Sequence, residues 1–214
     1  MAEPSFLTAT RSSYDAIADD YALRFHEEIA SKPLERALLV LFAELVRARG
    51  GPVLDVGCGG GQVTARLRDL GLDASGLDLS PGMLAVARRE HPGLEFREGS
   101  MTGLDVADGS LGGIVAMYST IHVPLAELPG VFAGFRRALA PGGECLLAFQ
   151  AGEGVLRMDE AFGHEVRLDF HRRTPEAIAD LLEDAGLQVH IRTWRARDRD
   201  ERTPHAFLIA RRPV

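Results

Sequence analysis

The sequence predicts an α/β fold built on a mostly parallel sheet that ends in an antiparallel hairpin. Short apolar runs alternate with amphipathic stretches between residues 53 and 186, and strands that alternate with helices form parallel sheets. Two strand-like runs, residues 187–194 and 205–210, then follow with no helix between them. Consecutive strands without a crossover helix pair antiparallel. The length of 214 residues fits one domain, and we expect a single domain over residues 1–214.

The N-terminal quarter of the chain is predicted to be helical. Residues 12–49 carry apolar side chains at a spacing of three to four. Tyr14 and Tyr21 are seven residues apart, so they lie on the same face of the first helix. Pro33 is expected to begin a second helix, and the glycine–proline break at residues 50–52 is expected to end it.

The other elements are expected to alternate along the chain. Thr174 has the hydroxyl of an N-terminal cap ahead of the last helix, and Gly186 suits its C-terminal end. We expect strands over residues 53–56, 73–78, 94–98, 111–118 and 144–149, and helices over residues 62–70, 81–90, 125–139 and 175–186, with the glycine–proline segment 140–143 between the third of these helices and the fifth strand.

Composition excludes several classes of protein. Hydrophobic residues make up 46% and charged residues 26%, which are values of a globular protein. No run approaches 18 apolar residues and residues 1–5 do not resemble a signal peptide, so we expect a cytoplasmic protein with no membrane partner. The net charge of −7 argues against a nucleic-acid partner. Lys32 is the only lysine among 24 basic residues, which suggests a GC-rich bacterial genome.

A glycine-rich segment follows the first predicted strand. Residues 53–61 read VLDVGCGGG, and glycines at a strand-to-helix turn allow positive φ and close approach of a ligand to the backbone. The dinucleotide fingerprint G-x-G-x-x-G needs a sixth-position glycine counted from Gly57, where Gln62 stands. A Walker A loop is excluded because no lysine follows. Counted from Asp55, the pattern is D-x-G-x-G-x-G.

An acidic residue ends the second predicted strand. Asp78 lies 21 residues after Gly57, which is the spacing expected for a carboxylate that accepts hydrogen bonds from ribose hydroxyls. Helix capping is the alternative role, but Ser80 directly before Pro81 is better placed for that. The third predicted strand ends in the turn 98–101, EGSM.

These motifs, in this order, resemble the class I S-adenosylmethionine (SAM)-dependent methyltransferases. The D-x-G-x-G-x-G segment is similar to motif I of that family, and residues 14–21, YDAIADDY, look like the N-terminal lid of its small-molecule branch, methyltransferase type 11. The resemblance continues through residues 139–143 to the final hairpin and covers nearly the whole chain. It implies a Rossmann-like, doubly wound sheet of seven strands, with helices on both faces and SAM across the C-terminal ends of strands one to four. Gly112 and Gly113 replace an aromatic–aspartate pair of many members, so we expect a loosened start of strand four.

The resemblance also implies which residues bind SAM and its product S-adenosylhomocysteine (SAH). Asp78 would hold the ribose, and Ser100 would accept a hydrogen bond from the adenine amino group. Asp55 would orient the loop or reach the methionine ammonium through water, unless it only shapes the turn. The expected cofactor residues are Tyr14, Tyr21, Asp55, Gly57, Cys58, Gly59, Gly61, Asp78, Leu79, Met83, Ser100, Met101 and Met117.

The acceptor of the methyl group is expected beyond strand four. His122 is our first candidate for a general base, since its unperturbed pKa of about 6.5 suits removal of a hydroxyl proton; a structural histidine bonded to the backbone is the alternative. Tyr118 is expected to line the same pocket or to pack at the strand end. Residues 1–49 would form a lid over the cofactor.

An insertion over residues 151–173 is expected to cover the acceptor pocket. Alternation of apolar and polar residues there predicts a strand-like hairpin. His164 and His171 are fallback bases and candidate substrate contacts, and Arg172, like Arg173, could bind an acceptor carboxylate. The spacing of the two histidines is poor for a metal, and we predict no metal site. The charged loop 195–202 is interpreted as a solvated turn.

Together these features predict an enzyme that transfers a methyl group from SAM to a small-molecule acceptor, at a hydroxyl or carboxylate oxygen. A chain of this length has room only for the N-terminal helices and the insertion as a lid, which favours a compact acceptor over RNA or protein. A non-catalytic SAM-binding protein and an N- or C-methyltransferase remain alternatives, and we expect a monomer or homodimer. The identity of the acceptor does not follow from the sequence.

Overall fold

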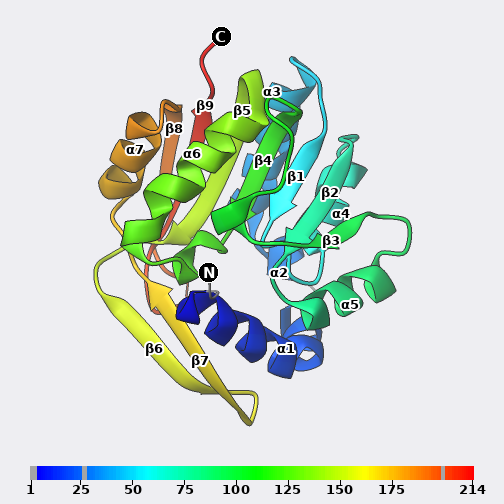
Figure 1. Cartoon of the computed structure of the whole chain (residues 1–214), viewed down its shortest axis with the longest axis vertical. Coiled ribbons are helices and arrows are strands. Elements are labelled where there is room, and N and C mark those ends of the chain that lie inside the picture. The colour runs from blue at the N-terminus through cyan, green and yellow to red at the C-terminus, as the bar shows by residue number, and fades with distance from the viewer. Residues whose placement is uncertain (1–3, 26–27, 199–200) are drawn as a thin grey trace.

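A seven-stranded sheet forms the centre of the molecule (Figure 1). The computed structural model describes residues 4–25, 28–198 and 201–214. The strand order is β3-β2-β1-β4-β5-β9-β8, and only β9 runs antiparallel to its neighbours. The sheet strands are β1 Val53–Val56, β2 Ala74–Asp78, β3 Phe96–Glu98, β4 Leu111–Met117, β5 Leu139–Gln150, β8 Gln188–Arg195 and β9 His205–Arg211. The predicted seven-stranded sheet with a C-terminal antiparallel hairpin is thereby confirmed.

Helices cover both faces of this sheet. The helices are α3 Pro33–Arg47, α4 Gln62–Asp69, α5 Pro81–Glu90, α6 Leu128–Ala138 and α7 Pro175–Asp184, with short 3-10 turns η1 Met101–Gly103, η2 Thr120–His122 and η3 Leu125–Glu127. On one face Phe132 of α6 and Leu182 of α7 belong to the same apolar cluster as Leu54 and Ile114. On the other face Phe42 of α3 belongs to a second cluster, with Val53 and Val115. Strands buried on both faces are apolar throughout, which is why β1 and β4 read as apolar runs in the sequence.

Two further elements lie across the C-terminal end of the parallel strands (Figure 1). Helix α1 spans Ser5–Phe25, and a separate hairpin is formed by β6 Val155–Ala161 and β7 His164–His171. Ile17 of α1 packs against Val166 and Leu168 of β7. The hairpin expected within residues 151–173 is confirmed, and the short helix α2, Glu28–Ser31, leads from α1 toward α3.

Helix α1 begins seven residues earlier than the predicted residue 12. The carbonyl of Pro4 accepts hydrogen bonds from the amides of Leu7 and Thr8 and so starts the first turn. Leu7 is buried and Phe6 packs against the main core. Phe6 and Leu7 are the only large apolar residues between residues 5 and 11, so the apolar spacing there is too short to indicate a helix.

The glycines near the start of β4 and β5 bear on two expectations. A side chain on Gly112 would collide with the carbonyl oxygen of Gly50, so glycine there permits a close approach of two chain segments. The pairing of β4 with β5 does shift in register between Leu111 and Gly113, at the expected place. Residues 140–143 do not separate α6 from β5 but form the irregular first part of that strand. Gly142 and Gly143 exchange backbone hydrogen bonds with Arg212, at 2.8 and 2.9 Å.

The loop between β8 and β9 is anchored, in contrast to the solvated turn that we predicted. Arg195 forms ion pairs with Glu35 of α3, at 2.9 Å, and with Glu201, at 2.5 Å. Lys32 contacts Glu201 at 2.7 Å. Residues 199–200 lie outside the described part of the chain. Charged side chains of this loop therefore form ion pairs in a cluster that joins α3 to the final hairpin.

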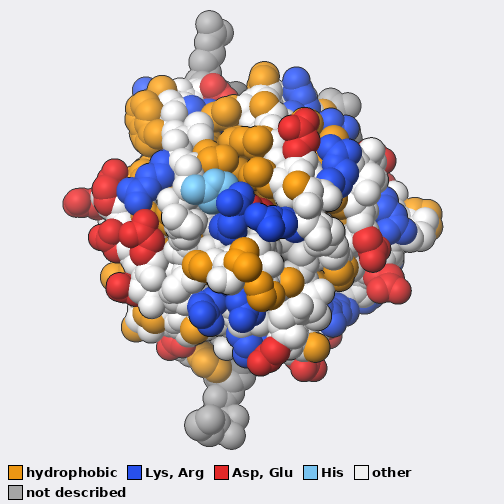
Figure 2. Space-filling view, turned by 90° about the horizontal axis from the view of Figure 1, so that it is seen from above, with side chains coloured by type: hydrophobic (Ala, Val, Ile, Leu, Met, Phe, Trp, Pro, Cys, Tyr) orange, Lys and Arg blue, Asp and Glu red, His pale blue; other side chains and the backbone are white. Residues whose placement is uncertain are grey.

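The end of the sheet at which the parallel strands begin is shown in Figure 2, where basic side chains lie beside an apolar patch. Arg137 and Arg212 close the C-terminal end of α6 here. The Arg137 guanidinium donates to the carbonyls of Leu104 and Val106, both at 2.6 Å, and Arg212 donates to the carbonyl of Arg136 at 3.2 Å. Cations at a helix C-terminus are favourable, so these arginines stabilise the fold at the end remote from α1. In the described ranges no helix is both long and apolar enough to cross a bilayer.

Candidate active site

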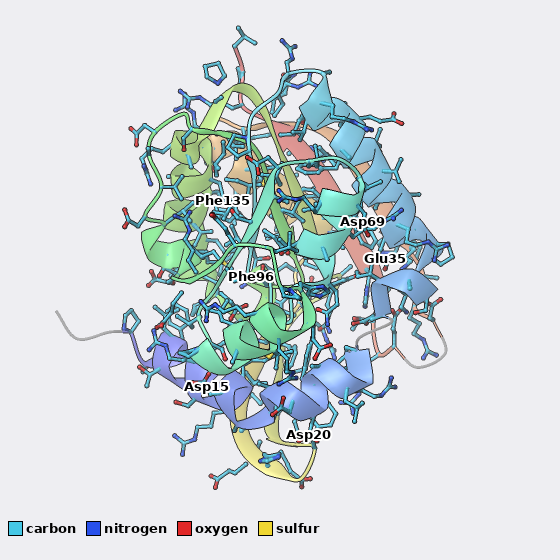
Figure 3. All side chains as sticks on the ribbon, turned by 90° about the vertical axis from the view of Figure 1, so that its right-hand side faces the viewer. Asp15, Asp20, Glu35, Asp69, Phe96 and Phe135 are labelled. Atoms are coloured by element: carbon cyan, nitrogen blue, oxygen red, sulfur yellow. The ribbon has the colours of Figure 1, made fainter. Side chains whose placement is uncertain are left out.

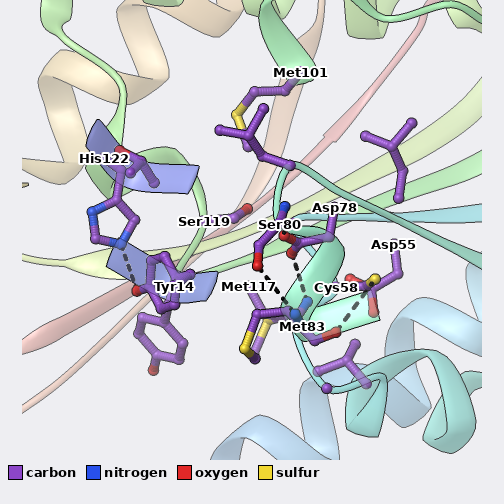
Figure 4. A pocket seen from close by; sticks show the side chains of 18 of the residues that line it. Tyr14, Asp55, Cys58, Asp78, Ser80, Met83, Met101, Met117, Ser119 and His122 are labelled. Carbon is purple, nitrogen blue, oxygen red and sulfur yellow. Dashed lines mark hydrogen bonds between the residues drawn. The ribbon is translucent and has the colours of Figure 1, made fainter. Parts of the chain in front are cut away.

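A deep pocket lies between the C-terminal ends of β1, β2 and β4 and the helix α1 that covers them (Figure 4). Its empty volume is about 1180 Å³ with the open solvent at its mouth included. Ligands of open α/β sheets bind at this end of the strands. The pocket is therefore correctly placed for a nucleotide-like cofactor.

Asp78 closes the glycine loop onto the end of β2. Its Oδ2 accepts a hydrogen bond from the amide of Gly59 at 2.8 Å, and its Oδ1 accepts one from the amide of Ser80 at 2.9 Å. Burial raises the pKa of Asp78, and these backbone hydrogen bonds lower it. A carboxylate has about four acceptor positions, so each oxygen retains one for a ligand hydroxyl. Ser80 caps α5 through its hydroxyl, which accepts from the amide of Met83 at 3.0 Å, as predicted.

The glycine loop itself follows β1. Gly57 has φ +74° and Gly59 has φ +52°, in the left-handed region that favours glycine. A side chain on Gly57 would collide with Ser119, whose hydroxyl donates to the carbonyl of Val56 at 2.7 Å. Gly61 is different: it does not line the pocket, and a side chain there would meet Phe96 at 2.7 Å. Gly61, which we expected to contact the cofactor, lies outside the pocket lining and leaves room for Phe96.

Asp55 lies below this loop and is 1% exposed. Its Oδ2 accepts a hydrogen bond from the hydroxyl of Thr64, on the first turn of α4, at 2.7 Å. Burial raises the pKa of Asp55 to about 7, although the hydrogen bond from Thr64 opposes that shift. Of the roles considered for Asp55, the structure shows the first: its hydrogen bond with Thr64 orients the glycine loop relative to α4.

The remaining predicted cofactor residues also line the pocket. Ser100 caps the 3-10 turn η1, because its hydroxyl oxygen accepts from the amide of Thr102 at 3.2 Å and lies 2.8 Å from the hydroxyl oxygen of Thr102. This local role was not anticipated. The other members that line the pocket are Cys58, Leu79, Met83, Met101 and Met117, together with Tyr14 and Tyr21 from α1.

Helix α1 is fastened to the cofactor side by hydrogen bonds that sequence reasoning missed. Asp15 lies on α1, where Figure 3 labels it. Its Oδ1 accepts from the hydroxyl of Ser80 at 2.5 Å and from the amide of Gly82 at 2.8 Å. Nε of Arg11 donates to the carbonyl of Leu79 at 3.2 Å. Polar residues on a helix carry no apolar period, so their only signal was their position beside Tyr14.

His122 lies on η2, directly opposite Tyr14 (Figure 4). Its Nε2 is 2.9 Å from the hydroxyl of Tyr14, and its Nδ1 is 3.0 Å from the carbonyl oxygen of Asp169 on β7. The side chain is buried, and burial lowers the pKa of His122 from 6.5 to about 4. The expectation of an unperturbed pKa near neutrality is therefore wrong, although His122 does line the pocket.

Tyr118 also lines the pocket, but its hydroxyl is engaged elsewhere. It donates to Oε1 of Glu35 at 3.1 Å and lies 2.8 Å from Nδ1 of His205. Neither partner lines the pocket. Tyr118 has φ +56°, an uncommon backbone conformation for a non-glycine residue, and this turn directs the chain from β4 into η2.

The structure does not bring the other predicted acceptor residues into the pocket. His164 is exposed, with Nε2 3.2 Å from Oδ2 of Asp20, and neither His171 nor Arg172 lines the cavity. Arg173 is instead the buried member of this segment. Its guanidinium donates to the carbonyls of Thr120 and Val123, on either side of His122. Within the described ranges no three potential ligand side chains group as a metal site would require.

Comparison with known proteins identifies the family. The model of a methyltransferase domain family matches residues 53–143. The ubiquinone biosynthesis O-methyltransferase of Xanthomonas axonopodis pv. citri is 30% identical over 179 residues, which are 74% of this chain and 72% of that protein. This chain belongs to the class I SAM-dependent methyltransferases. The family and its cofactor, both predicted from the sequence, are confirmed.

Three further relatives and one solved structure show how far the similarity extends. The malonyl-[acyl-carrier protein] O-methyltransferase of Pectobacterium atrosepticum is 32% identical over 151 residues, 70% of this chain. This chain spans only 57% of that relative, and it spans 57% and 62% of two demethylmenaquinone methyltransferases. Among the solved structures, the SAH complex of DhpI superimposes on this chain with a TM-score of 0.74 at 24% sequence identity. The alignment covers 99% of each of the two chains. That likeness concerns the fold and includes both α1 and the β6–β7 hairpin in its extent.

Proposed function

We propose that this protein transfers a methyl group from SAM to an oxygen atom of a small-molecule acceptor. One observation carries the proposal: a single pocket joins the Asp78–Gly59 edge, suited to a nucleoside, to the paired polar groups of Tyr14 and His122. The first edge fits the cofactor of the family. The second offers a hydrogen-bonding pair at the wall where a second molecule must enter.

The residues on the cofactor side fit SAM. Asp78 has one free acceptor position on each carboxylate oxygen for the two ribose hydroxyls. Gly57 and Gly59 leave the backbone of the loop open to close approach, and Leu79 and Met101 offer apolar contacts for the adenine. When bound, SAM supplies an activated methyl group on its sulfonium sulfur. The protein residues then have three tasks: to bind, to orient and to exclude water.

Helix α1 and β7 provide the means to exclude water. Tyr14, Tyr21 and Phe25 line the pocket from α1, and Tyr14 and Tyr21 contact each other edge to face at a centroid distance of 5.6 Å. The ring of Phe170 on β7 packs against the ring of His122, with a centroid distance of 4.8 Å. A reaction between a charged cofactor and a neutral acceptor gains from such an enclosed, apolar site. The enclosure also supports a small acceptor.

Oxygen as the acceptor atom is supported by the chemistry of the wall and by the relatives. A hydroxyl acceptor must lose a proton, and the neutral imidazole of His122 provides an acceptor for it. The relatives from Xanthomonas and Pectobacterium are both named as O-methyltransferases. A carboxylate acceptor would require only positioning in the same place.

Binding and transfer can be tested in sequence. Calorimetry should detect binding of SAM and SAH, and NAD should not bind. A panel of small hydroxy, carboxy and amino compounds should then be screened for transfer of labelled methyl from SAM. We expect transfer to a hydroxy or carboxy compound. Binding of SAM without transfer to any compound would favour the non-catalytic alternative, and NAD binding alone would refute the assignment of the pocket.

A further inference from the structure

We propose that Tyr14 is a catalytic residue which takes the proton of the acceptor hydroxyl and passes its own proton to His122. The inference rests on the proposed function and narrows the acceptor to an alcohol or phenol. Tyr14 lies on α1 and His122 on η2, and the two side chains meet in the pocket at a distance of 2.9 Å (Figure 4). Sequence reasoning placed Tyr14 with the cofactor and gave His122 the proton by itself.

The hydrogen bonds of His122 fix which nitrogen carries its proton. The carbonyl oxygen of Asp169 can only accept, so Nδ1, at 3.0 Å, must be the donor. In a neutral imidazole the other nitrogen is then an acceptor. Nε2 consequently accepts the hydrogen bond from the Tyr14 hydroxyl. The lone pair that would remove a substrate proton already points at Tyr14, so His122 reaches an acceptor through the tyrosine.

The surroundings keep this pair neutral before reaction. The charged or titratable groups that influence His122 are Tyr14 from α1, Asp169 and His171 from β7, and Arg173 beyond it. Burial dominates and lowers the pKa of His122, and burial with the nearby Tyr21 and Asp78 raises the pKa of Tyr14 well above its ordinary value. A phenol that donates to His122 still has an acceptor position, and that position is available to a ligand in the pocket.

The step balances in atoms and charge. The new bond joins the acceptor oxygen to the methyl carbon, and the bond from that carbon to sulfur breaks, with its electron pair left on sulfur in SAH. The acceptor proton moves to the Tyr14 oxygen while the Tyr14 proton moves to Nε2 of His122. An oxygen that has gained a methyl group and kept its proton is a much stronger acid than imidazolium, so a base of low pKa suffices. The imidazolium returns its proton to solvent through the same pair after the product leaves.

Substitutions separate a relay from direct action of His122. We expect Tyr14→Phe and His122→Gln each to lower kcat roughly 100-fold or more. The double variant should lose no more kcat than the more impaired of the two single variants. His91→Gln, outside the pocket at the end of α5, serves as the control for loss of a histidine. SAM affinity is measured separately for each variant by calorimetry. Retention of kcat within threefold by Tyr14→Phe, or losses that multiply in the double variant, would overturn the relay.

A second readout does not depend on turnover. In nitrogen-15 spectra of the imidazole groups, His122 should show protonated Nδ1 and bare Nε2. Tyr14→Phe removes the donor that stabilises the neutral ring, so the pKa of His122 should rise. The opposite tautomer, or a pKa unchanged by Tyr14→Phe, would refute the pairing. If no acceptor is methylated by the wild type, the proposed function fails, and these spectra still decide whether the pair exists.

Discussion

Burial of His122 determines both what this residue can do and how the protein responds to acid. An imidazole on an exposed loop would keep a pKa near 6.5, whereas the enclosed ring of His122 has a pKa of about 4. The sequence identified the residue because it follows the end of β4. It could not reveal the shift, because the groups that bury the ring come from α1 and β7, 108 and 47 residues away.

We predict that His122 makes stability fall with acidification. The unfolded chain protonates this histidine below about pH 6.5 and the folded protein only below about pH 4. Its contribution is thus fully present above pH 6.5 and is lost as pH falls to 4, a change of about 3 kcal/mol in the free energy of unfolding. The measurement is urea unfolding of wild type and His122→Gln at pH 7 and pH 4. Asp55, whose pKa is raised to about 7, acts in the opposite direction in both proteins and cancels in the comparison. An equal response of the two proteins to pH would contradict the burial argument.

Asp78 is the residue on which cofactor binding should depend most. We predict that Asp78→Ala weakens SAM binding by about 2–3 kcal/mol, because a charged acceptor that serves two hydroxyls is lost. Asp78→Asn keeps one oxygen acceptor and the shape of the side chain, so its loss should be smaller. Glu98→Gln, at the end of the neighbouring strand β3, is the charge-matched control. Calorimetry decides the question, and an unchanged dissociation constant in a folded Asp78→Ala protein would remove this residue from the site.

At the scale of elements, the short turn η2 is held by a single buried cation. Arg173 donates to the carbonyls of Thr120 and Val123, and burial lowers its pKa to about 10. We predict that Arg173→Met lowers the free energy of unfolding by on the order of 2–3 kcal/mol, since buried carbonyls then lack donors. Arg172→Met, one residue earlier, should cost less than 1 kcal/mol. Urea unfolding of both variants tests this, and equal losses would show that η2 does not depend on Arg173.

Helix α1 is the element expected to respond to cofactor. Asp15 joins it to the N-terminus of α5, and Tyr14 and Tyr21 face the pocket. We predict that amide exchange in residues 14–25 slows when SAH is added, because a ligand that contacts both α1 and the sheet stabilises their association. Residues of α7, which is remote from the pocket, provide the internal reference. Unchanged exchange in α1 would reduce its tyrosines to ordinary packing.

At the scale of the whole molecule, the sequence predicted the parallel sheet, its C-terminal hairpin and the glycine loop because these depend on local patterns. Apolar runs mark strands that are buried on both faces, and the acid at the end of β2 has a fixed spacing from Gly57. Contacts between segments that are distant along the chain could not be predicted from the sequence. His164 and Arg172 were assigned to the pocket from their place in the insertion, but the backbone carbonyl of Asp169 and the guanidinium of Arg173 contact η2 instead.

The acceptor side was the least predictable part for the same reason. Tyr118 follows β4 more closely than His122 does, yet its hydroxyl joins Glu35 and His205 in the charge cluster that anchors the β8–β9 loop. Only the three-dimensional arrangement shows that Tyr14, from the beginning of the chain, is the partner of His122. The predicted cofactor residues Gly57 and Asp78 lie at the ends of the neighbouring strands β1 and β2, so their proximity required no such information.

Transfer of a carbon-13-labelled methyl group from SAM tests the proposed function most directly. The protein is incubated with labelled SAM and an acceptor found in the screen, and the product is analysed by NMR together with the SAH formed. We predict one equivalent of SAH for each methyl group, with the label bonded to oxygen. A label bonded to nitrogen or carbon, or SAM that remains bound and unchanged with every acceptor, would contradict oxygen methylation by this pocket.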